Sequence, residues 1–403
     1  MLAERNFRTF YLGYVTSLLG TSMSTVAIAW AVLETTGSAP DLGYVMAANV
    51  VPQVLLLAVA GAVADRLGRR RVMLSADALR CCAQASLAVT VFAGRPPLWL
   101  FLVLASIRGS GEAFFSPALG ALTVEVAPAR QLGNANALYG LAQSATRIGG
   151  PALSGVFVAV AGPASVIAAD AVSYAVSVVA LSLLRLPPVP AGGERRTLLR
   201  DMVEGWSDFR SRTWLWVVSL QWAFFNLITW SPWMVLGPVL GRDYLGGPAV
   251  WGAIMATQGA GAIAGGLACL GRRPRRPMVI ATIAVFGYTM PDIPMALHAT
   301  AIWVAMGAFA CGAGSALSST YFGAAMQQQV PQDRLARVTS LSLFSSFGIG
   351  VVGYGVDGPL AGVFGAPALF AVGAVYGILS SAAVLALPAV RAVRWQEKPD
   401  PAP

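Results

Sequence analysis

Long apolar segments constrain this chain of 403 residues more than any other feature of its sequence. Twelve stretches are long and apolar enough to cross the roughly 30 Å hydrocarbon core of a bilayer as helices, which takes about 20 residues each. They lie near residues 9–33, 42–64, 72–93, 98–124, 134–161, 164–184, 214–240, 249–270, 277–297, 299–326, 336–361 and 367–388. We therefore predict an all-α integral membrane protein with twelve transmembrane helices in two six-helix bundles.

The scarcity of charged residues supports this assignment and argues against several classes of function. Only 11% of the residues are charged and 56% are hydrophobic, with a mean hydropathy of +0.67, whereas soluble domains carry about 25% charged residues. The chain has one lysine, Lys398, and one histidine, His298. A phosphate-binding loop needs a lysine inside the loop, and histidine metal sites or Ser–His–Asp catalysis would depend on a single residue. We expect no enzyme, metal site or cofactor.

The arginines predict the orientation. If the N-terminus is cytoplasmic, the outside loops hold only Arg95 and Arg242, against the acids Glu34, Asp41, Asp243 and Asp292. The remaining basic clusters then fall inside, as expected for a membrane protein: Arg5 and Arg8, residues 66–71, Arg130, residues 185–212, residues 272–276, Arg334 and Arg337, and the tail. The net charge of +9 therefore reports topology and does not indicate nucleic-acid binding. We expect both termini in the cytoplasm and a multi-pass protein of a plasma membrane, here a bacterial inner membrane.

Two pairs of similar sequence segments indicate a duplicated unit. Residues 61–73 align with 266–278 at an offset of 205, and residues 126–130 align with 330–334 at an offset of 204. Such repeats are typical of transporters built from two parallel halves. The predicted domains are an N-terminal bundle (1–186), a cytoplasmic linker (187–213), a C-terminal bundle (214–390) and a cytoplasmic tail (391–403). In the linker, six apolar residues between Leu198 and Phe209 share one helical face, which predicts either an amphipathic helix on the membrane surface or an ordered linker without function.

The loop Asp65-Arg66-Leu67-Gly68-Arg69-Arg70-Arg71 resembles the signature of the major facilitator superfamily between spans two and three. Residues 150–155 are similar to the span-five signature of its antiporters, although Ser154 replaces a glycine and Thr146 stands where an earlier glycine is usual. Residues 108–118 and 134–138 resemble the drug/proton antiporter-like branch that holds macrolide-efflux proteins and siderophore (enterobactin-type) exporters. The resemblance implies proton-coupled efflux of hydrophobic or amphiphilic small molecules, of antibiotic or siderophore class, by alternating access.

Two departures from the family pattern bear on the proton site. Many drug–proton antiporters of the superfamily carry an acid inside span one, but no acid lies between Glu4 and Glu34. The span-four signature usually has glutamine three residues after its arginine, and here that position is Gly111, followed by Glu112. The proton-binding group is therefore expected in another span.

Ionisable residues inside the spans are candidates for proton coupling, because an unpaired charge in the bilayer interior is costly. The candidates are Glu112, Arg108, Asp170 and Arg147. Arg108 and Glu112 lie four residues apart on one face, so Glu112 could alternate between pairing with Arg108 and binding a proton, or the pair could only stabilise packing. Asp170 is the second candidate carrier. Asp77 and Arg80, three residues apart near the inner surface, indicate a structural pair.

The family-like loop is a candidate conformational latch. We expect Asp65 to end span two and cap span three, while Arg69 or Arg66 pairs with Glu125 at the inner end of span four. The alternative is that the arginines only hold the loop inside. The latch residues are Gly61, Asp65, Arg66, Gly68, Arg69, Arg70 and Glu125, and the second copy lacks the acid because Leu270 replaces it. A bend in span five is assigned to Gly149, Gly150, Pro151 and Gly155.

Polar and indole side chains inside the spans are candidates for the substrate cavity. They are Thr21, Asn49, Gln53, Gln143, Trp222, Asn226 and Trp230, while Trp233 could equally belong to the interfacial belt. A largely apolar wall with few polar groups suits amphiphilic solutes. The expected partners are a small-molecule substrate, protons and the lipid bilayer, with no nucleic acid and a functional monomer. An importer or lipid transporter of the same superfamily and a non-transporting membrane sensor remain alternatives.

Overall fold

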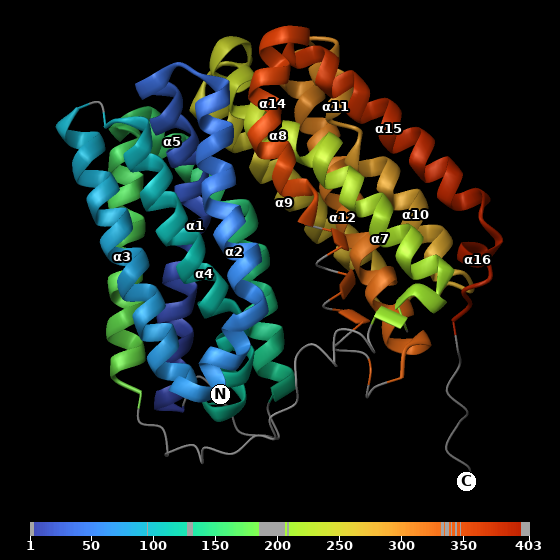
Figure 1. Cartoon of the computed structure of the whole chain (residues 1–403), viewed down its shortest axis with the longest axis horizontal. Coiled ribbons are helices and arrows are strands. Elements are labelled where there is room, and N and C mark those ends of the chain that lie inside the picture. The colour runs from blue at the N-terminus through green and yellow to red at the C-terminus, as the bar shows by residue number, and fades with distance from the viewer. Residues whose placement is uncertain are drawn as a thin grey trace. The chain divides into compact units, whose positions relative to one another are not determined.

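A computed structural model describes residues 4–94, 96–126, 132–184, 206–207, 209–331, 334, 338–339, 341–342, 345–346 and 348–395. Every regular element in these ranges is helical, and they contain no strand (Figure 1). The chain is therefore all-α over the described residues, as predicted.

Five long helices form the first half of the described chain. They are α1 (Arg5–Thr36), α2 (Ala39–Leu67), α3 (Arg69–Ala93), α4 (Leu98–Val126) and α5 (Leu132–Ser182). Gly68 separates α2 from α3 with a φ of +89°, in a region that favours glycine. The helix α5 joins two predicted spans, and Gly162 with a φ of +77° marks the corner between them.

The second half is more broken. Its elements are α7 (Thr213–Phe225), the π-helix η2 (Asn226–Trp230), α8 (Ser231–Leu240), the π-helix η3 (Gly241–Leu245), α9 (Pro248–Cys269), α10 (Pro277–Tyr288), α11 (Asp292–Ala296), α12 (Ala301–Gln329), α14 (Gly350–Phe364), α15 (Ala366–Ala386) and α16 (Pro388–Arg391). A proline explains the π-helix η2 in part. In an α-helix the N–H of residue 232 would donate to the Ile228 carbonyl, but Pro232 has no N–H.

Ten helical stretches of the described chain are long and apolar enough to span a membrane. One of them, residues 137–182, has 46 residues and is long enough for two crossings. The predicted span 336–361 lies partly outside the described residues, and α14 covers its end. The structure thus supports a multi-pass membrane protein, while the count of twelve spans and the cytoplasmic termini stay predictions.

The chain divides into two compact units that are discontinuous in sequence. Unit 1 comprises residues 1–193, 234–256 and 354–363, and unit 2 comprises residues 194–233, 257–353 and 364–403. This division differs from two contiguous bundles, because segments 234–256 and 354–363 belong to unit 1. Most of the predicted linker and its amphipathic face lie outside the described residues, as does the tail beyond Trp395.

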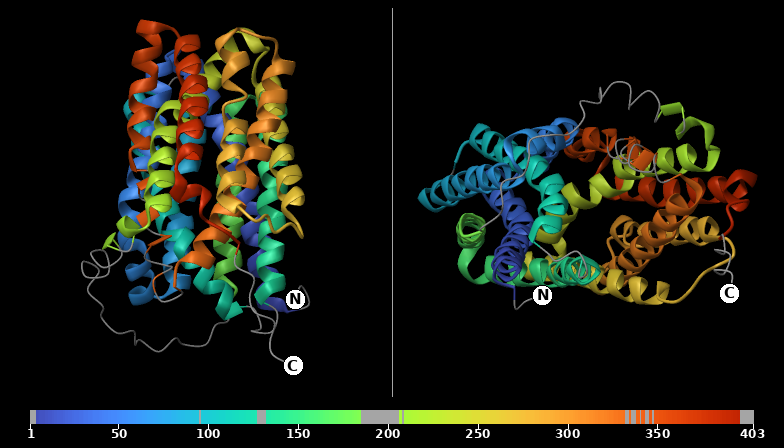
Figure 2. Two further views of the ribbon diagram at one scale, coloured as in Figure 1. Left: turned by 90° about the vertical axis from the view of Figure 1, so that its right-hand side faces the viewer. Right: turned by 90° about the horizontal axis from the view of Figure 1, so that it is seen from below.

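Each unit has its own apolar core. In unit 1 the core includes Phe7, Phe10 and Tyr139, and the rings of Phe7 and Phe10 on α1 lie 6.1 Å and 6.3 Å from the Tyr139 ring on α5. In unit 2 it includes Trp214 and Met278, from α7 and α10. Figure 2 shows the helices from two further directions. The cores rigidify the helices that carry the polar side chains described next.

Candidate functional site

A cluster of buried charged and polar side chains lies inside unit 1. Residues on α3 and on the second part of α5 recur at spacings of three and four, which places them on single helical faces. The cluster, called the buried network below, consists of Asp77, Arg80 and Gln84 of α3, Arg108 and Glu112 of α4, Asp170, Tyr174 and Ser177 of α5, and Ser24 of α1.

The buried network has two branches, and Arg80 is the centre of the first. Its Nη1 donates to Glu112 Oε2 at 2.5 Å, and its Nη2 donates to Asp77 Oδ1. The second oxygen of Asp77 accepts a hydrogen bond from Ser177 Oγ at 2.5 Å. The Arg80 guanidinium also lies 4.6 Å from the centroid of the Tyr174 ring, at a distance suited to a cation–π contact. One buried guanidinium therefore holds two carboxylates from different helices.

Gly111 makes this arrangement possible. A Cβ at position 111 would lie 2.6 Å from Arg80 Cγ, which is closer than real Cβ contacts allow. The departure from the family pattern at this position therefore has a steric reason. A glutamine here would require the Arg80 side chain to move.

Asp170 is the centre of the second branch. Its carboxylate accepts a hydrogen bond from Gln84 Nε2 at 2.5 Å, and the same amide donates to Ser24 Oγ at 2.6 Å. Ser173 Oγ donates to the Asp170 backbone carbonyl at 2.7 Å. A Cβ at Gly20 would lie 2.8 Å from Asp170 Oδ1, so the glycine leaves room for the carboxylate. Asp170 itself is fully buried.

Tyr174 and Arg108 lie between the two branches. The Tyr174 hydroxyl hydrogen-bonds Thr21 Oγ1 at 2.8 Å, and the Arg108 guanidinium lies near Tyr174 and Asp170. The Glu112 side chain is 36% exposed, whereas those of Asp77 and Arg80 are 0% and 2% exposed. Glu112 and Arg108 are thus the partly exposed charges of the network, whereas Asp77, Arg80 and Asp170 are buried.

Three of the four predicted coupling residues lie in the buried network, and one does not. Arg147 is exposed on α5 and takes no part in it. The expected Arg108–Glu112 ion pair is absent from the ion pairs of the described residues, because Arg80 of α3 reaches Glu112 across Gly111. The predicted Asp77–Arg80 ion pair is present and is buried inside the protein, with the two side chains 0% and 2% exposed.

The loop between α2 and α3 contains one of the two expected ion pairs. Arg69 Nη1 lies 2.7 Å from Glu125 Oε1 on α4, while Arg66 is exposed. Arg70 donates to two backbone carbonyls at the end of α5, those of Leu181 at 2.7 Å and Ser182 at 2.6 Å. The loop therefore joins three helices of unit 1.

The helix ends in this loop differ from the expectation. The helix α2 continues to Leu67, and Gly68 is the N-cap residue of α3 and has no side chain to cap it. Asp65 therefore lies inside α2, whose last residue is Leu67. The Asp65 side chain lies outside the described part of the chain, so its role as a cap of α3 stays a prediction.

The predicted bend in span five is a site of close approach without a break in the helix. A Cβ at Gly150 would collide with Ser22 of α1, and one at Gly155 would lie 2.5 Å from the Pro248 carbonyl of α9, also in unit 1. Gly149 has open space around it, and α5 passes through Pro151. The residue with a non-helical backbone is Gly162, at the corner of α5.

The polar cavity candidates of unit 1 have protein partners, apart from Gln53, which is half-buried. Thr21 pairs with Tyr174, as described above. Asn49 Nδ2 donates to the Ala105 carbonyl at 3.2 Å, and Gln143 Nε2 donates to the Tyr14 hydroxyl at 3.1 Å.

The cavity candidates of unit 2 lie in and beside an aromatic cluster. Trp222 meets Tyr288 edge to face at a centroid distance of 4.9 Å, and Trp230 packs on the same cluster. Asn226 is buried and donates to the Ser346 carbonyl at 3.1 Å.

One acid of unit 2 was placed wrongly by the sequence. Asp292 was expected in an outer loop, but it begins α11, inside the helical stretch 277–296, and is 1% exposed. The nearby prolines Pro291 and Pro294 are typical of a loop, but the chain forms the short helix α11 there. A break in a span beside an acid is the signal that could have found it.

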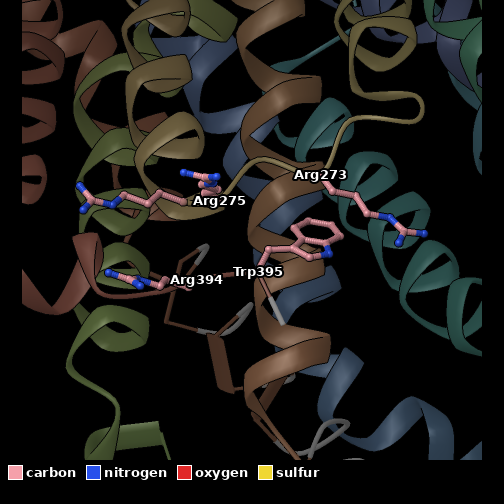
Figure 3. Close-up of a pocket in the computed structure, with 5 residues that line it drawn as sticks. Arg273, Arg275, Arg394 and Trp395 are labelled. Atoms are coloured by element: carbon pink, nitrogen blue, oxygen red, sulfur yellow. The ribbon is translucent and has the colours of Figure 1, made fainter. Parts of the chain in front are cut away.

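The second copy of the basic loop lies at a pocket of about 340 Å³ (Figure 3). The lining residues are Arg273, Arg275, Arg276, Arg394 and Trp395, without a carboxylate among them. The Trp395 amide donates to the Arg275 carbonyl at 3.2 Å. In Figure 3 the Arg273 side chain extends away from those of Arg275 and Arg394, so these guanidinium groups do not converge on one point.

Comparisons with known proteins identify similar transport proteins. The chain is 26% identical over 349 residues to macrolide efflux protein A of Streptococcus pyogenes, covering 83% of this chain and 84% of that protein. It is 27% identical over 404 residues to the multidrug efflux pump Tap of Mycolicibacterium fortuitum, covering 96% of each. These proteins are transporters named for efflux, and the chain is accordingly a multi-pass transport protein of the cell membrane.

Solved structures with the same fold include two transporters. A nucleoside transporter, NupG, matches with a TM-score of 0.69 at 14% identity, over 94% of this chain and 98% of that one. A D-xylose–proton symporter matches with a TM-score of 0.66 at 13% identity, over 96% and 98%. At such identities the likeness concerns the fold alone. The model of the Major Facilitator Superfamily matches residues 10–354, most of the chain. The chain therefore belongs to the Major Facilitator Superfamily.

Proposed function

We propose that the chain exports hydrophobic or amphiphilic small molecules by alternating access, driven by protons that bind the buried network of unit 1. It would act as a monomer with twelve spans and cytoplasmic termini. The names of the efflux relatives support the direction and the substrate class. The observation that carries the proposal is the ion-paired cluster around Arg80, buried inside a membrane-spanning unit.

The charges of the network favour the binding of one proton. Three carboxylates, those of Asp77, Glu112 and Asp170, face only two guanidinium groups, those of Arg80 and Arg108. With every group ionised, the network carries one negative charge in excess. Because an unbalanced charge is unfavourable inside a membrane protein, one bound proton would neutralise the network.

Glu112 is the group best placed to exchange that proton with water, since its side chain is the partly exposed carboxylate of the network. A protonated Glu112 would no longer attract Arg80 as an ion, which would weaken a bond between α3 and α4. Arg80 could then turn wholly to Asp77, which is tied to α5 through Ser177. Proton binding would thus change which helices are held together, as a coupled transporter requires.

Each unit would supply candidate substrate contacts of its own. In unit 2 Trp222 and Trp230 offer indole faces to an apolar solute and Asn226 offers a polar group, while in unit 1 the polar candidates are Thr21, Asn49, Gln53 and Gln143. The ion pair between Arg69 and Glu125, which belongs to the latch, would form and break during the transport cycle.

Proteoliposomes with an imposed pH gradient test the proposal. The probes are erythromycin, a macrolide, and the amphiphilic cation ethidium. We expect the wild type to move a probe against its concentration gradient in exchange for protons. Glu112→Gln and Asp170→Asn should lose this accumulation, while Glu34→Gln, an exposed acid of α1, should retain it. Full gradient-driven transport by Glu112→Gln, or no effect of the gradient on the wild type, would overturn the proposal.

A further inference from the structure

The carboxyl group of Asp292 in unit 2 accepts no hydrogen bond from the described residues. Asp292 is 1% exposed, and both of its carboxyl oxygens are buried. Buried polar groups in proteins are nearly always paired, so an orphaned carboxyl requires an explanation. The neighbouring backbone is also unusual, because α10 ends at Tyr288 and turns with hydrogen bonds between residues i and i+3 lead to the start of α11 at Asp292.

The described helices that pack around this carboxyl carry no counter-ion. The helices α12 and α15 pack on α11, and η2 and α10 pack on α15. None of these four elements, nor α7, contains a lysine, arginine, histidine, aspartate or glutamate. The titratable groups that they contribute are neutral in their ordinary state: Tyr288, Cys311, Tyr321 and Tyr376. His298, beyond the end of α11, is exposed. An ionised Asp292 would therefore be an isolated buried charge.

The carboxyl shares the space beside Gly373 with two hydrogen-bond acceptors. A Cβ built on Gly373 would lie 2.8 Å from Asp292 Oδ2, 3.2 Å from the Ile228 carbonyl oxygen and 3.4 Å from Thr229 Oγ1. The Thr229 hydroxyl donates its proton to the Gly373 carbonyl, which leaves its oxygen as an acceptor. Such surroundings suit a carboxylic acid, which has a proton to donate, and would repel a carboxylate.

The internal repeat relates this site to the network of unit 1. The offset of 205 that aligns the two basic loops also aligns Ser24 with Thr229. Ser24 accepts a hydrogen bond from the amide that holds Asp170, and Thr229 lies beside Asp292. Both units thus have a carboxyl group next to the same position of their first span. The acid is on the sixth span of the repeat in unit 1 and on the third in unit 2.

We propose that Asp292 is a second proton-binding site of this protein. It is held as a carboxylic acid whose O–H is donated to the Ile228 carbonyl or to Thr229 Oγ1. It releases that proton to water when the broken segment α10–α11 opens during the transport cycle. The bound proton follows from unit 2 alone, and its release during transport rests on the proposed function.

Infrared difference spectroscopy tests the bound proton without any substrate. The protein is reconstituted in lipid vesicles, and the C=O stretching band of protonated carboxyl groups is recorded at neutral pH in H₂O and D₂O. We expect Asp292→Asn to remove part of this band, while Asp243→Asn, whose side chain is 49% exposed, leaves it unchanged. An identical band in the wild type and Asp292→Asn would overturn the proposal. Gly373→Ala, whose Cβ would crowd the carboxyl, should shift the band.

Transport in the same vesicles tests whether the proton is used. We expect Asp292→Asn to move fewer protons per molecule of ethidium than the wild type, while downhill movement of ethidium persists. An asparagine would replace a merely structural carboxylic acid without changing this ratio, so an unchanged ratio would refute the coupling role. If the wild type moves no protons, the proposed function fails, and the infrared band still decides whether Asp292 is protonated.

Discussion

The two units keep buried carboxyl groups in different ways. In unit 1, Asp77, Asp170 and the partly exposed Glu112 lie among two arginines, an amide and hydroxyl groups. In unit 2, Asp292 lies beside two acceptors with no basic residue on the surrounding described helices. The stability of a buried ionised carboxylate depends on every neighbour that compensates its charge. The stability of a buried carboxylic acid depends on its keeping its proton. Substitutions at the two places should therefore have unequal costs.

Removing the central guanidinium should have the largest effect. Arg80→Met leaves Asp77 and Glu112 without their shared partner, and breaking a buried ion pair in this way costs about 3–5 kcal/mol. We expect a large fall in the thermal unfolding temperature of the purified protein and no transport. Adding Asp77→Asn and Glu112→Gln should restore part of the stability. An Arg80→Met protein as stable as the wild type would show that the carboxyl groups of unit 1 do not depend on Arg80.

Crowding the same guanidinium should have the next largest effect. Gly111→Ala places a Cβ 2.6 Å from Arg80 Cγ, and overpacking a well-filled site costs about 1–3 kcal/mol. Gly120→Ala is the matched control, because it lies on the same helix and has no neighbour within 4 Å of the new Cβ. Thermal unfolding should separate the two variants, with Gly120→Ala unchanged or slightly stabilised by its higher helix propensity. Equal stabilities would mean that Arg80 moves freely.

Neutral replacement of the two kinds of acid compares the units directly. Asp292→Asn exchanges one neutral polar group for another, so we expect a loss of stability of less than about 1 kcal/mol. Asp77→Asn leaves the buried Arg80 with one carboxylate fewer and should cost more. The measurement is chemical unfolding of both variants in one lipid or detergent. The comparison between the units would fail if Asp292→Asn were the more damaging of the two.

The smallest effect on stability is expected at the loop ion pair. Arg69 and Glu125 are partly exposed, at 31% and 18%, and such pairs contribute about 0–1 kcal/mol. Arg69→Gln should therefore leave unfolding nearly unchanged while slowing transport, if the pair acts as a latch. The control is Arg273→Gln, an exposed arginine of the second basic loop. Equal transport rates for the two variants would remove the latch from the mechanism.

Much of the fold could be predicted from the sequence, because hydrophobic length and arginine placement are local properties. The partners inside the site were harder to predict. Helical spacing suggested Arg108 for Glu112, since both lie on α4, but the pairing is decided by how closely α3 approaches at Gly111. Asp292 was counted among the acids of the outer loops, and the close approach of the distant Gly373 to its carboxyl is not visible in the local sequence. The periodicity of a single helix does not predict which residues of another helix it contacts.

Arg70 has a consequence for the length of a helix elsewhere in the chain. Its guanidinium donates to the carbonyls of Leu181 and Ser182 in the last turn of α5, where carbonyl groups often lack helical N–H partners, although the Leu181 carbonyl also accepts a long hydrogen bond of 3.4 Å from the Leu184 N–H. The sequence from Leu181 to Leu186 contains no glycine or proline that would stop α5, and Pro187 follows only afterwards. The end of α5 is thus fixed by a side chain 111 residues earlier in the chain. A chimaera that exchanged this loop for its basic counterpart in unit 2 would be expected to fray or extend α5, changing where the chain leaves unit 1.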